Sequence, residues 1–149
     1  MLRISAAVAI LLSLSACAIN QNVQPVAPFS AREICLIENP AVRAGVIEAY
    51  QRTLREKGYV VKRLPPQSAV TECNVTTTYT ANWQWDMAMY MSYAQIKVFR
   101  DGYQVGEASY DARGGGGNMS KFIDADKKIT ELVNQLYPSG SGRSLQNGS

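Results

Sequence analysis

The chain has 149 residues, with 15 basic and 12 acidic side chains and a formal net charge of +3. Such a small charge excess, without a basic stripe interleaved with aromatic residues, argues against nucleic-acid binding. The sequence contains no histidine, which excludes Ser-His-Asp and Cys-His catalysis, histidine-ligated metals and the usual general base near neutral pH. We therefore expect no enzymatic activity, no cofactor and no metal site.

The first 16 residues are typical of a secretory signal. Arg3 supplies a positive charge, and an apolar or small stretch of about 13 residues follows from Ile4 to Ala16. This stretch is too short to cross a hydrocarbon core, which needs roughly 20 residues. We interpret residues 1–16 as a signal peptide that is removed on export.

The end of this signal, Leu14-Ser15-Ala16-Cys17, resembles the lipobox of bacterial lipoproteins. The resemblance implies cleavage before Cys17, attachment of a lipid to its thiol and acylation, for example with palmitate, of the new amino terminus. Several acyl chains on one residue anchor a protein stably. An aspartate after the cysteine commonly retains a lipoprotein at the inner membrane. Because Ala18 stands there, we expect the periplasmic face of the outer membrane, with the inner membrane as the alternative.

The rest of the chain divides by composition. Residues 17–32 are interpreted as the lipidated cysteine and a flexible tether, because the segment is polar and contains proline. Residues 33–138 have the length of one domain. The small, polar residues 139–149 predict a disordered tail.

Lipidation of Cys17 leaves two further cysteines, Cys35 and Cys73. In an oxidising compartment we expect them to form a disulfide. The bond would close a loop of about 38 residues. Such a loop is worth roughly 4 kcal/mol in the chain-entropy model. Two free or metal-binding thiols are the alternative, which the absence of histidine and of a CxxC spacing disfavours.

Apolar runs and alternation predict the strands of the domain. They cover 33–38, 59–64, a long stretch from Cys73 to about residue 86, 90–100 and 103–110. Asp101-Gly102 predicts a hairpin turn, and another reversal is expected within 86–89. Helical spacing predicts one helix that begins at Asn39-Pro40 and ends at Gly58, and a second over 121–137. The four glycines at 114–117 predict a flexible loop.

This order of elements predicts an α+β fold, a two-layer sandwich. We expect an antiparallel-rich sheet of four or five strands with two helices on one face, in the order β-α-β-β-β-(β)-α. The other face of the sheet would be uncovered.

The stretch 83–93 contains both tryptophans and three of the five methionines. If a hairpin reverses here, these side chains cannot all face one core, and exposed aromatic and methionine clusters suit adaptable binding surfaces. Ordinary packing under the helices is the alternative, which we favour for the first tryptophan, whereas exposure is favoured for the second tryptophan and the first two methionines. The candidate interaction residues are Trp83, Trp85, Met87, Met89 and Met91.

The stretch from Cys35 to Tyr137 resembles a family of small lipoproteins of Gram-negative bacteria that has no established activity. The phrases that carry the resemblance are Glu38-Asn39-Pro40-Ala41-Val42-Arg43, Thr78-Tyr79-Thr80-Ala81-Asn82-Trp83 and Lys121-Phe122-Ile123-Asp124-Ala125. A looser similarity, at the level of the fold, is to envelope-assembly lipoproteins of the LptE type. Function does not follow from fold alone.

We therefore expect a membrane-anchored, periplasm-facing lipoprotein that acts as a non-catalytic binding or assembly component of the cell envelope. Its partner would be another envelope protein or the membrane surface, contacted through the Trp/Met segment and the uncovered sheet face. The alternative is a small-ligand or glycan-binding lipoprotein that uses the Trp83/Trp85 region, since aromatic faces stack on sugars.

Overall fold

The computed structural model describes residues 18–138; the signal segment, Cys17 and the tail from residue 139 onward lie outside the described residues. The strands are β1 (Asn20–Gln24), β2 (Glu33–Ile37), β3 (Val60–Leu64), β4 (Val75–Asp86), β5 (Ala88–Arg100) and β6 (Tyr103–Asp111). The helices are α1 (Ala44–Glu56), the short 3-10 helix η1 (Met119–Phe122) and α2 (Ala125–Leu136).

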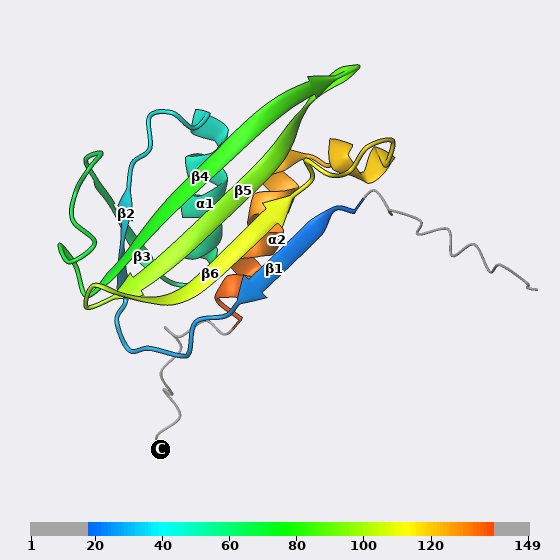
Figure 1. The fold of residues 1–149 in the computed structure, drawn as a ribbon. Coiled ribbons are helices and arrows are strands. Elements are labelled where there is room, and N and C mark those ends of the chain that lie inside the picture. Colours follow the sequence, from blue (N-terminus) through cyan, green and yellow to red (C-terminus); the bar gives the residue numbers. More distant parts are fainter. Residues whose placement is uncertain (1–17, 139–149) are drawn as a thin grey trace, which may run out of the picture.

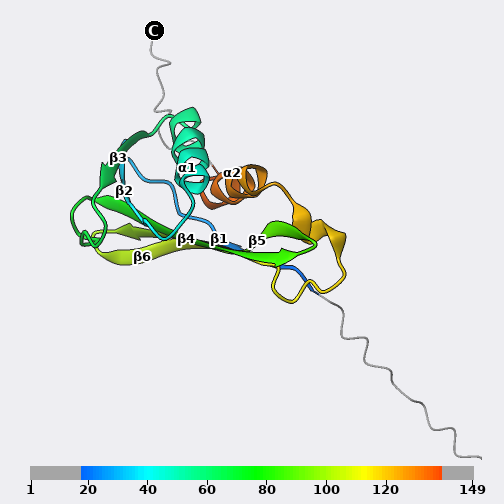
Figure 2. The ribbon, with the colours of Figure 1, turned by 90° about the horizontal axis from the view of Figure 1, so that it is seen from above.

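The strands form one sheet in the order β1-β6-β5-β4-β2-β3. Strand β2 runs parallel to β3 and β4, because the chain crosses over through α1 between β2 and β3, while the other neighbours are antiparallel. Figures 1 and 2 show α1 and α2 on the same face of the sheet, with the opposite face bare. The predicted α+β sandwich is confirmed, but its sheet is mixed and has six strands rather than four or five.

The additional strand, β1, lies inside the segment that the sequence predicted to be a flexible tether. Strand β1 pairs along its whole length with β6, and the backbone N–H of Val26 then donates to the carbonyl of Leu136 at 2.9 Å. The ring of Phe29 stacks on Tyr59 with 5.6 Å between centroids. The tether prediction is therefore wrong for the described part of the segment. An edge strand with mostly exposed, polar side chains lacks the apolar alternation from which strands are predicted.

The first predicted helix ends where expected, at Gly58, whose φ of +93° suits glycine. Its predicted start at Asn39-Pro40 is wrong, because α1 begins at Ala44. The amide of Asn39 donates instead to the carbonyl of Tyr79 at 3.2 Å, which fastens the turn to β4. The second predicted helix is shorter than expected: η1 comes first, and α2 begins after Asp124.

A polar cluster lies within the core between the helices and β4. The hydroxyl of Tyr50 lies 2.7 Å from the Thr77 Oγ1 and 3.1 Å from the Tyr137 hydroxyl. Thr77 in turn donates to the carbonyl of Lys97 at 2.8 Å. Burial raises the pKa of Tyr50 to about 12, so the hydroxyl stays neutral and retains its proton for donation. The cluster fixes α1 and the end of α2 on the sheet without placing a charge in the core.

Cys35 and Cys73 form the predicted disulfide, with their Cα atoms 6.2 Å apart. The bond joins β2 to the loop that precedes β4. Two residues of β2, Cys35 and Leu36, pair with β4, so this contact between strands is short. Cys35 also packs in a small apolar cluster with Ile37 and Leu64. The disulfide thus reinforces the side of the sheet where strand pairing is least extensive.

We expect a large loss of stability when this bond is absent. The double variant Cys35→Ala with Cys73→Ala should lower the free energy of unfolding by up to about 4 kcal/mol, because the unfolded chain regains the entropy of the open loop. Chemical denaturation measures this loss. Mass spectrometry of the native protein without reductant should recover the two cysteine peptides joined, and recovery of both as alkylated free thiols would refute the pairing.

Candidate functional site

The hairpin of β4 and β5 extends past the helices at one end of the sheet (Figure 1). Its strands pair out to Asp86 and Ala88, and Met87 makes the turn with a φ of +62°. Trp85 is 71% exposed, Met87 88% and Met89 52%, as the sequence predicted for these three residues. Met119 of η1 is 74% exposed. We call Trp85, Met87, Met89 and Met119 the apolar tip.

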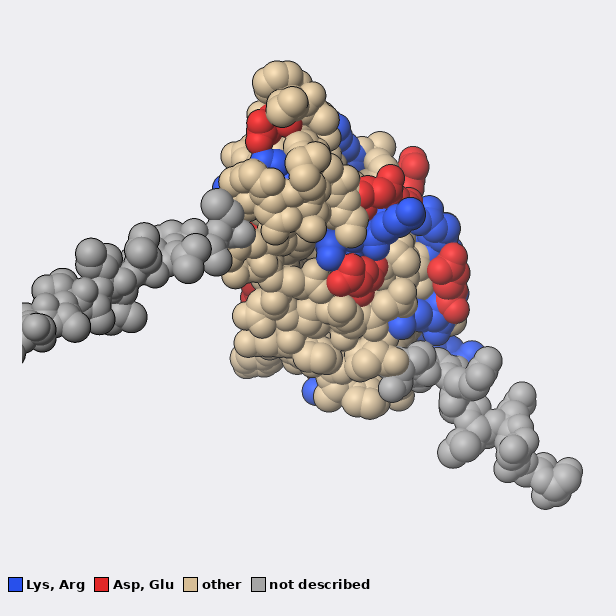
Figure 3. All heavy atoms as spheres, turned by 90° about the vertical axis from the view of Figure 1, so that its right-hand side faces the viewer, with Lys and Arg blue, Asp and Glu red and all other residues tan. Residues whose placement is uncertain are grey.

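The apolar tip accounts for four of the six strongly exposed large apolar side chains among residues 18–138. A pocket of about 590 Å³ lies between the hairpin and η1. Its lining includes Met87, Met89, Met119, Phe122, Asp86 and Lys121. Figure 3 views this end of the molecule, and there the charged side chains gather toward the helices while the projecting hairpin is largely uncharged.

Lys121 holds the hairpin and the η1 segment together. It is only 3% exposed, and its ammonium group donates to the carboxylate of Asp86 and to the carbonyl of Gly116. The ammonium also lies 5.3 Å from the ring centroids of Tyr90 and Phe122. The sequence does not predict this role, because a single lysine after a glycine run has no periodicity that indicates burial. The ion pair with Lys121 neutralises Asp86, which is the only charged residue in the stretch 83–91.

Two of the five candidate residues pack against the core: for Trp83 this is the packing that the sequence favoured, whereas Met91 was predicted as an interaction residue. Trp83 is half-buried against the core, with the Arg43 guanidinium 4.6 Å above its ring. Met91 is 1% exposed, so its assignment to an interaction surface is wrong. The reason is a register shift: Asn82 pairs with Tyr93, but Trp83 pairs with Met91. This irregularity turns Met91 to the same side as Trp83, toward the core.

The glycan-binding alternative would use the ring faces of Trp83 and Trp85, which lie on the same strand. Trp85 is two residues farther along β4 than Trp83, and Arg43 covers the Trp83 ring. The pocket at this end is lined by methionine and phenylalanine, with neither tryptophan in its wall.

The bare face of the sheet carries both polar and aromatic side chains where β5 crosses it, and Tyr93 and Phe99 are the aromatic ones. Its half-buried side chains alternate along β5 with the buried residues of the core, as in Gln95 and Lys97. The amide of Gln95 donates to the carboxylate of Glu107 at 2.7 Å. Most of the strongly exposed large apolar side chains of residues 18–138 lie at the tip.

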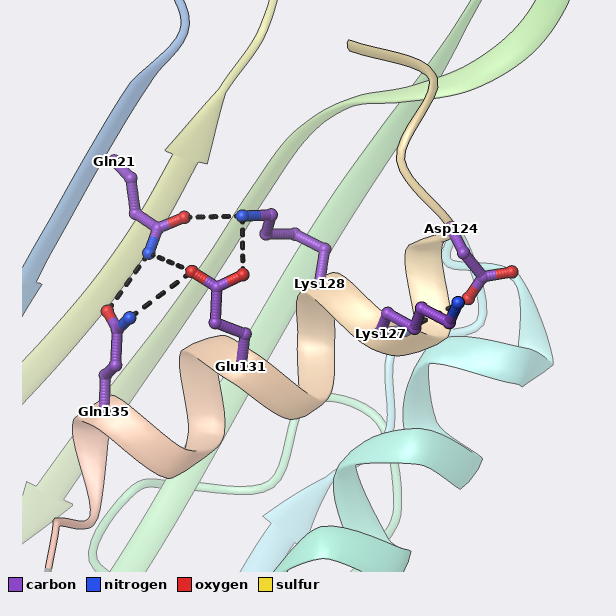
Figure 4. Close-up of polar contacts among 6 residues, drawn as sticks. All are labelled: Gln21, Asp124, Lys127, Lys128, Glu131 and Gln135. Atoms are coloured by element: carbon purple, nitrogen blue, oxygen red, sulfur yellow. Dashed lines mark hydrogen bonds and ion pairs between the residues drawn. The ribbon is translucent and has the colours of Figure 1, made fainter. Parts of the chain in front are cut away.

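Four side chains connect β1 to α2 through hydrogen bonds (Figure 4). We call Gln21, Lys128, Glu131 and Gln135 the clasp. The amide of Gln21 donates to Glu131 at 2.8 Å and to Gln135 at 3.0 Å. The ammonium group of Lys128 donates to Gln21 at 2.9 Å and to Glu131 at 2.8 Å. Lys128 is 8% exposed and lies 5.0 Å from the ring of Tyr110. At the start of the same helix, Asp124 caps the backbone N–H of Lys127 at 3.0 Å.

The first described residues lie against the loop that leads to η1. A Cβ atom built on Gly115 would come within 3.4 Å of Ile19, and one on Gly114 within 3.2 Å of the carbonyl of Ala18. Figure 1 shows the start of β1, in blue, at the same end of the sheet as this yellow-to-orange loop. Cys17, the predicted lipidation site, is outside the described residues but precedes Ala18 directly. No helix within 18–138 is both long and apolar enough to cross a bilayer.

No model of a known protein family matches the sequence, and no curated protein does. Among solved structures, the fold is similar to a leucine-to-methionine variant of PelC from Paraburkholderia phytofirmans, a dodecamer. The TM-score is 0.55 and the identity 11%, over 85% of this chain and 100% of that one.

Two weaker similarities are to another PelC dodecamer from the same organism and to a minor lipoprotein from Acinetobacter baumannii. The former has a TM-score of 0.49 and 12% identity, over 80% of this chain and 95% of that one. The latter has a TM-score of 0.40 and 13% identity, over 75% and 92%. At such identities the first similarity establishes a shared fold, and the other two carry no further argument.

Exposure of the tip predicts how its residues respond to substitution. Replacing Met87 and Met89 with serine should change the free energy of unfolding by no more than about 0.5 kcal/mol per residue, as for other surface sites. The matched control is Met91→Ala, which removes a buried side chain from the same strand and should cost about 2–5 kcal/mol. Thermal melts of the variants measure both effects. A large loss of stability in the serine variants would show that Met87 and Met89 pack in the core.

The clasp predicts a pH dependence for β1. Hydrogen bonds from Lys128 and from Gln21 lower the pKa of Glu131. A lowered pKa in the folded state means that the carboxylate stabilises β1 above the usual glutamate value of about 4.3, and that this stabilisation is lost as the pH falls through the folded value. Hydrogen-exchange protection of the β1 amides should therefore fall across this acidic range relative to β5.

The matched variant is Glu131→Gln, which cannot ionise. Its β1 amides should be less protected at neutral pH and should lose the acid-dependent step. Equal pH profiles in the variant and the native protein would contradict the role of Glu131.

Proposed function

We propose that this protein is a lipoprotein of the bacterial cell envelope that works by binding rather than by catalysis. Residues 1–16 would be removed on export, and a lipid on Cys17 would anchor the mature chain. The observation that carries this proposal is the sequence Leu14–Cys17, which resembles a lipobox and directly precedes a folded domain with a disulfide. The proposed location is the periplasmic face of the outer membrane, because Ala18 follows the cysteine.

The chemistry of the described residues supports a binding role. The ammonium groups of Lys121 and Lys128 are already engaged by carboxylates, and both cysteines of the domain are oxidised. What the domain offers its surroundings is the apolar tip. An exposed cluster of this kind is typical of an interaction site. Its methionines can adapt to a partner surface, since the thioether side chain is flexible and polarisable.

A second copy of this chain is one candidate partner. PelC from Paraburkholderia phytofirmans is a dodecamer, and its full length aligns with this fold. Both edge strands of the described sheet, β1 and β3, have a side without a neighbouring strand and could contribute to such an assembly. Mass photometry of the detergent-solubilised, lipidated protein would distinguish a ring of copies from a monomer that binds other envelope components.

The anchor is tested by Cys17→Ser. Cells supplied with an alkyne fatty acid should label the native protein, and the variant should be unlabelled and retain its signal peptide. Click chemistry on gels measures the label, and mass spectrometry of the amino terminus measures cleavage. The control is the double variant Cys35→Ser with Cys73→Ser, which should still be labelled. Equal labelling of Cys17→Ser would refute the proposal.

A further inference from the structure

We propose that the apolar tip is a membrane contact, which enters the headgroup region of the leaflet that holds the lipid anchor. The domain would then stand against the bilayer in one orientation rather than hang from a tether. This inference rests on the proposed lipidation of Cys17. It goes further by naming the surface that the tip binds.

The first step is the length of the connection to the anchor. Ala18 and Ile19 lie against Gly114 and Gly115, and β1 is held to β6 and α2 from Asn20 onward. Consecutive Cα atoms are about 3.8 Å apart, so Cys17 is one such step from a fixed point of the fold. A free coil of about 15 residues would instead allow a span on the order of 20 Å. A lipid on Cys17 would therefore hold the membrane surface close to the folded domain.

The second step is that the anchor point and the tip belong to the same end of the domain. The loop that contacts Ala18 continues into η1, which carries Met119. Lys121 of η1 is bonded to Asp86 in the hairpin and to Gly116 in the loop. A lipid surface held at Cys17 would lie at the end of the domain to which the loop, η1 and the hairpin belong.

The third step is the chemistry of the tip. Its most exposed residues are methionines and Trp85, and an indole combines an apolar body with an N–H, which suits the interface between headgroups and acyl chains. The charge of Asp86 is compensated by Lys121, so approach to lipid leaves no uncompensated charge in the stretch 83–91. A soluble protein partner would fit the same side chains. The proposed lipid on Cys17, however, would bring a membrane surface to this end of the domain.

The two tryptophans of the chain allow a direct test with a matched control. The lipidated full-length protein is reconstituted into phosphatidylethanolamine–phosphatidylglycerol vesicles, with or without lipids brominated near the headgroup end of the acyl chain. Trp83→Phe leaves Trp85 as the only tryptophan, and Trp85→Phe leaves Trp83. We expect bromine to reduce the Trp85 emission about twofold or more and to leave the half-buried Trp83 nearly unchanged.

Flotation of the protein with the vesicles reports the anchor separately. If the protein floats but Trp85 is insensitive to bromine and open to aqueous acrylamide, the membrane contact is refuted while the anchor stands. If Trp85 is shielded from both quenchers, a second copy covers the tip, and the membrane contact is also refuted. Failure to float refutes the proposed function itself. If Trp83→Phe does not fold, the difference between the native protein and Trp85→Phe provides the same measurement.

Discussion

The attachment of β1 to β6 and α2 is the interaction on which the functional interpretation depends. Lys128 is almost fully buried, and a buried ammonium group is costly unless it has partners. Gln21 and Glu131 supply these partners at 2.9 and 2.8 Å. The docking of β1 and the burial of Lys128 therefore require one another. A network of this kind is worth a few hydrogen bonds, each of about 1 kcal/mol, which is enough to hold a five-residue strand already paired along its backbone.

A second buried lysine performs the corresponding task at the tip. Lys121 joins the hairpin to η1 over 35 positions of sequence, whereas Lys128 joins α2 to β1 over 107. Both ammonium groups also lie near aromatic rings, Tyr90 and Tyr110 respectively, which favours a cation over the ring face. In each case a charged group that sequence patterning would place on the surface connects two segments that are distant in the chain.

The consequence for function is geometric. Strand β1 gives the fold a start that is paired to β6 and bonded to α2. The Lys121 contacts connect the hairpin with the loop against which Ala18 lies. The bare face of the sheet carries polar pairs such as Gln95 and Glu107 beside the aromatic residues Tyr93 and Phe99. If Cys17 carries the proposed lipid, the position of Ala18 beside this loop would orient the apolar tip relative to the membrane.

The sequence by itself determined the features that depend on neighbouring residues. Asp101 and Gly102 form the predicted turn with φ values of +52° and +84°, and Gly58 ends the first helix, because these conformations are local properties of the backbone. Alternation predicted β4 to β6, and the number of cysteines in an oxidising compartment predicted the disulfide. The exposure of Trp85, Met87 and Met89 followed from the need to reverse the chain near them.

Only the tertiary structure decided the features that depend on residues far apart. Strand β1 exists through pairing with β6, roughly ninety positions later in the chain. Met91 is buried because a register shift between two strands turned it to the core. Lys121 is buried because Asp86 and Gly116 meet it there. The position of Ala18 beside the loop before η1 has the same origin. Each of these contacts joins segments that are distant in the chain, so no local pattern encodes them.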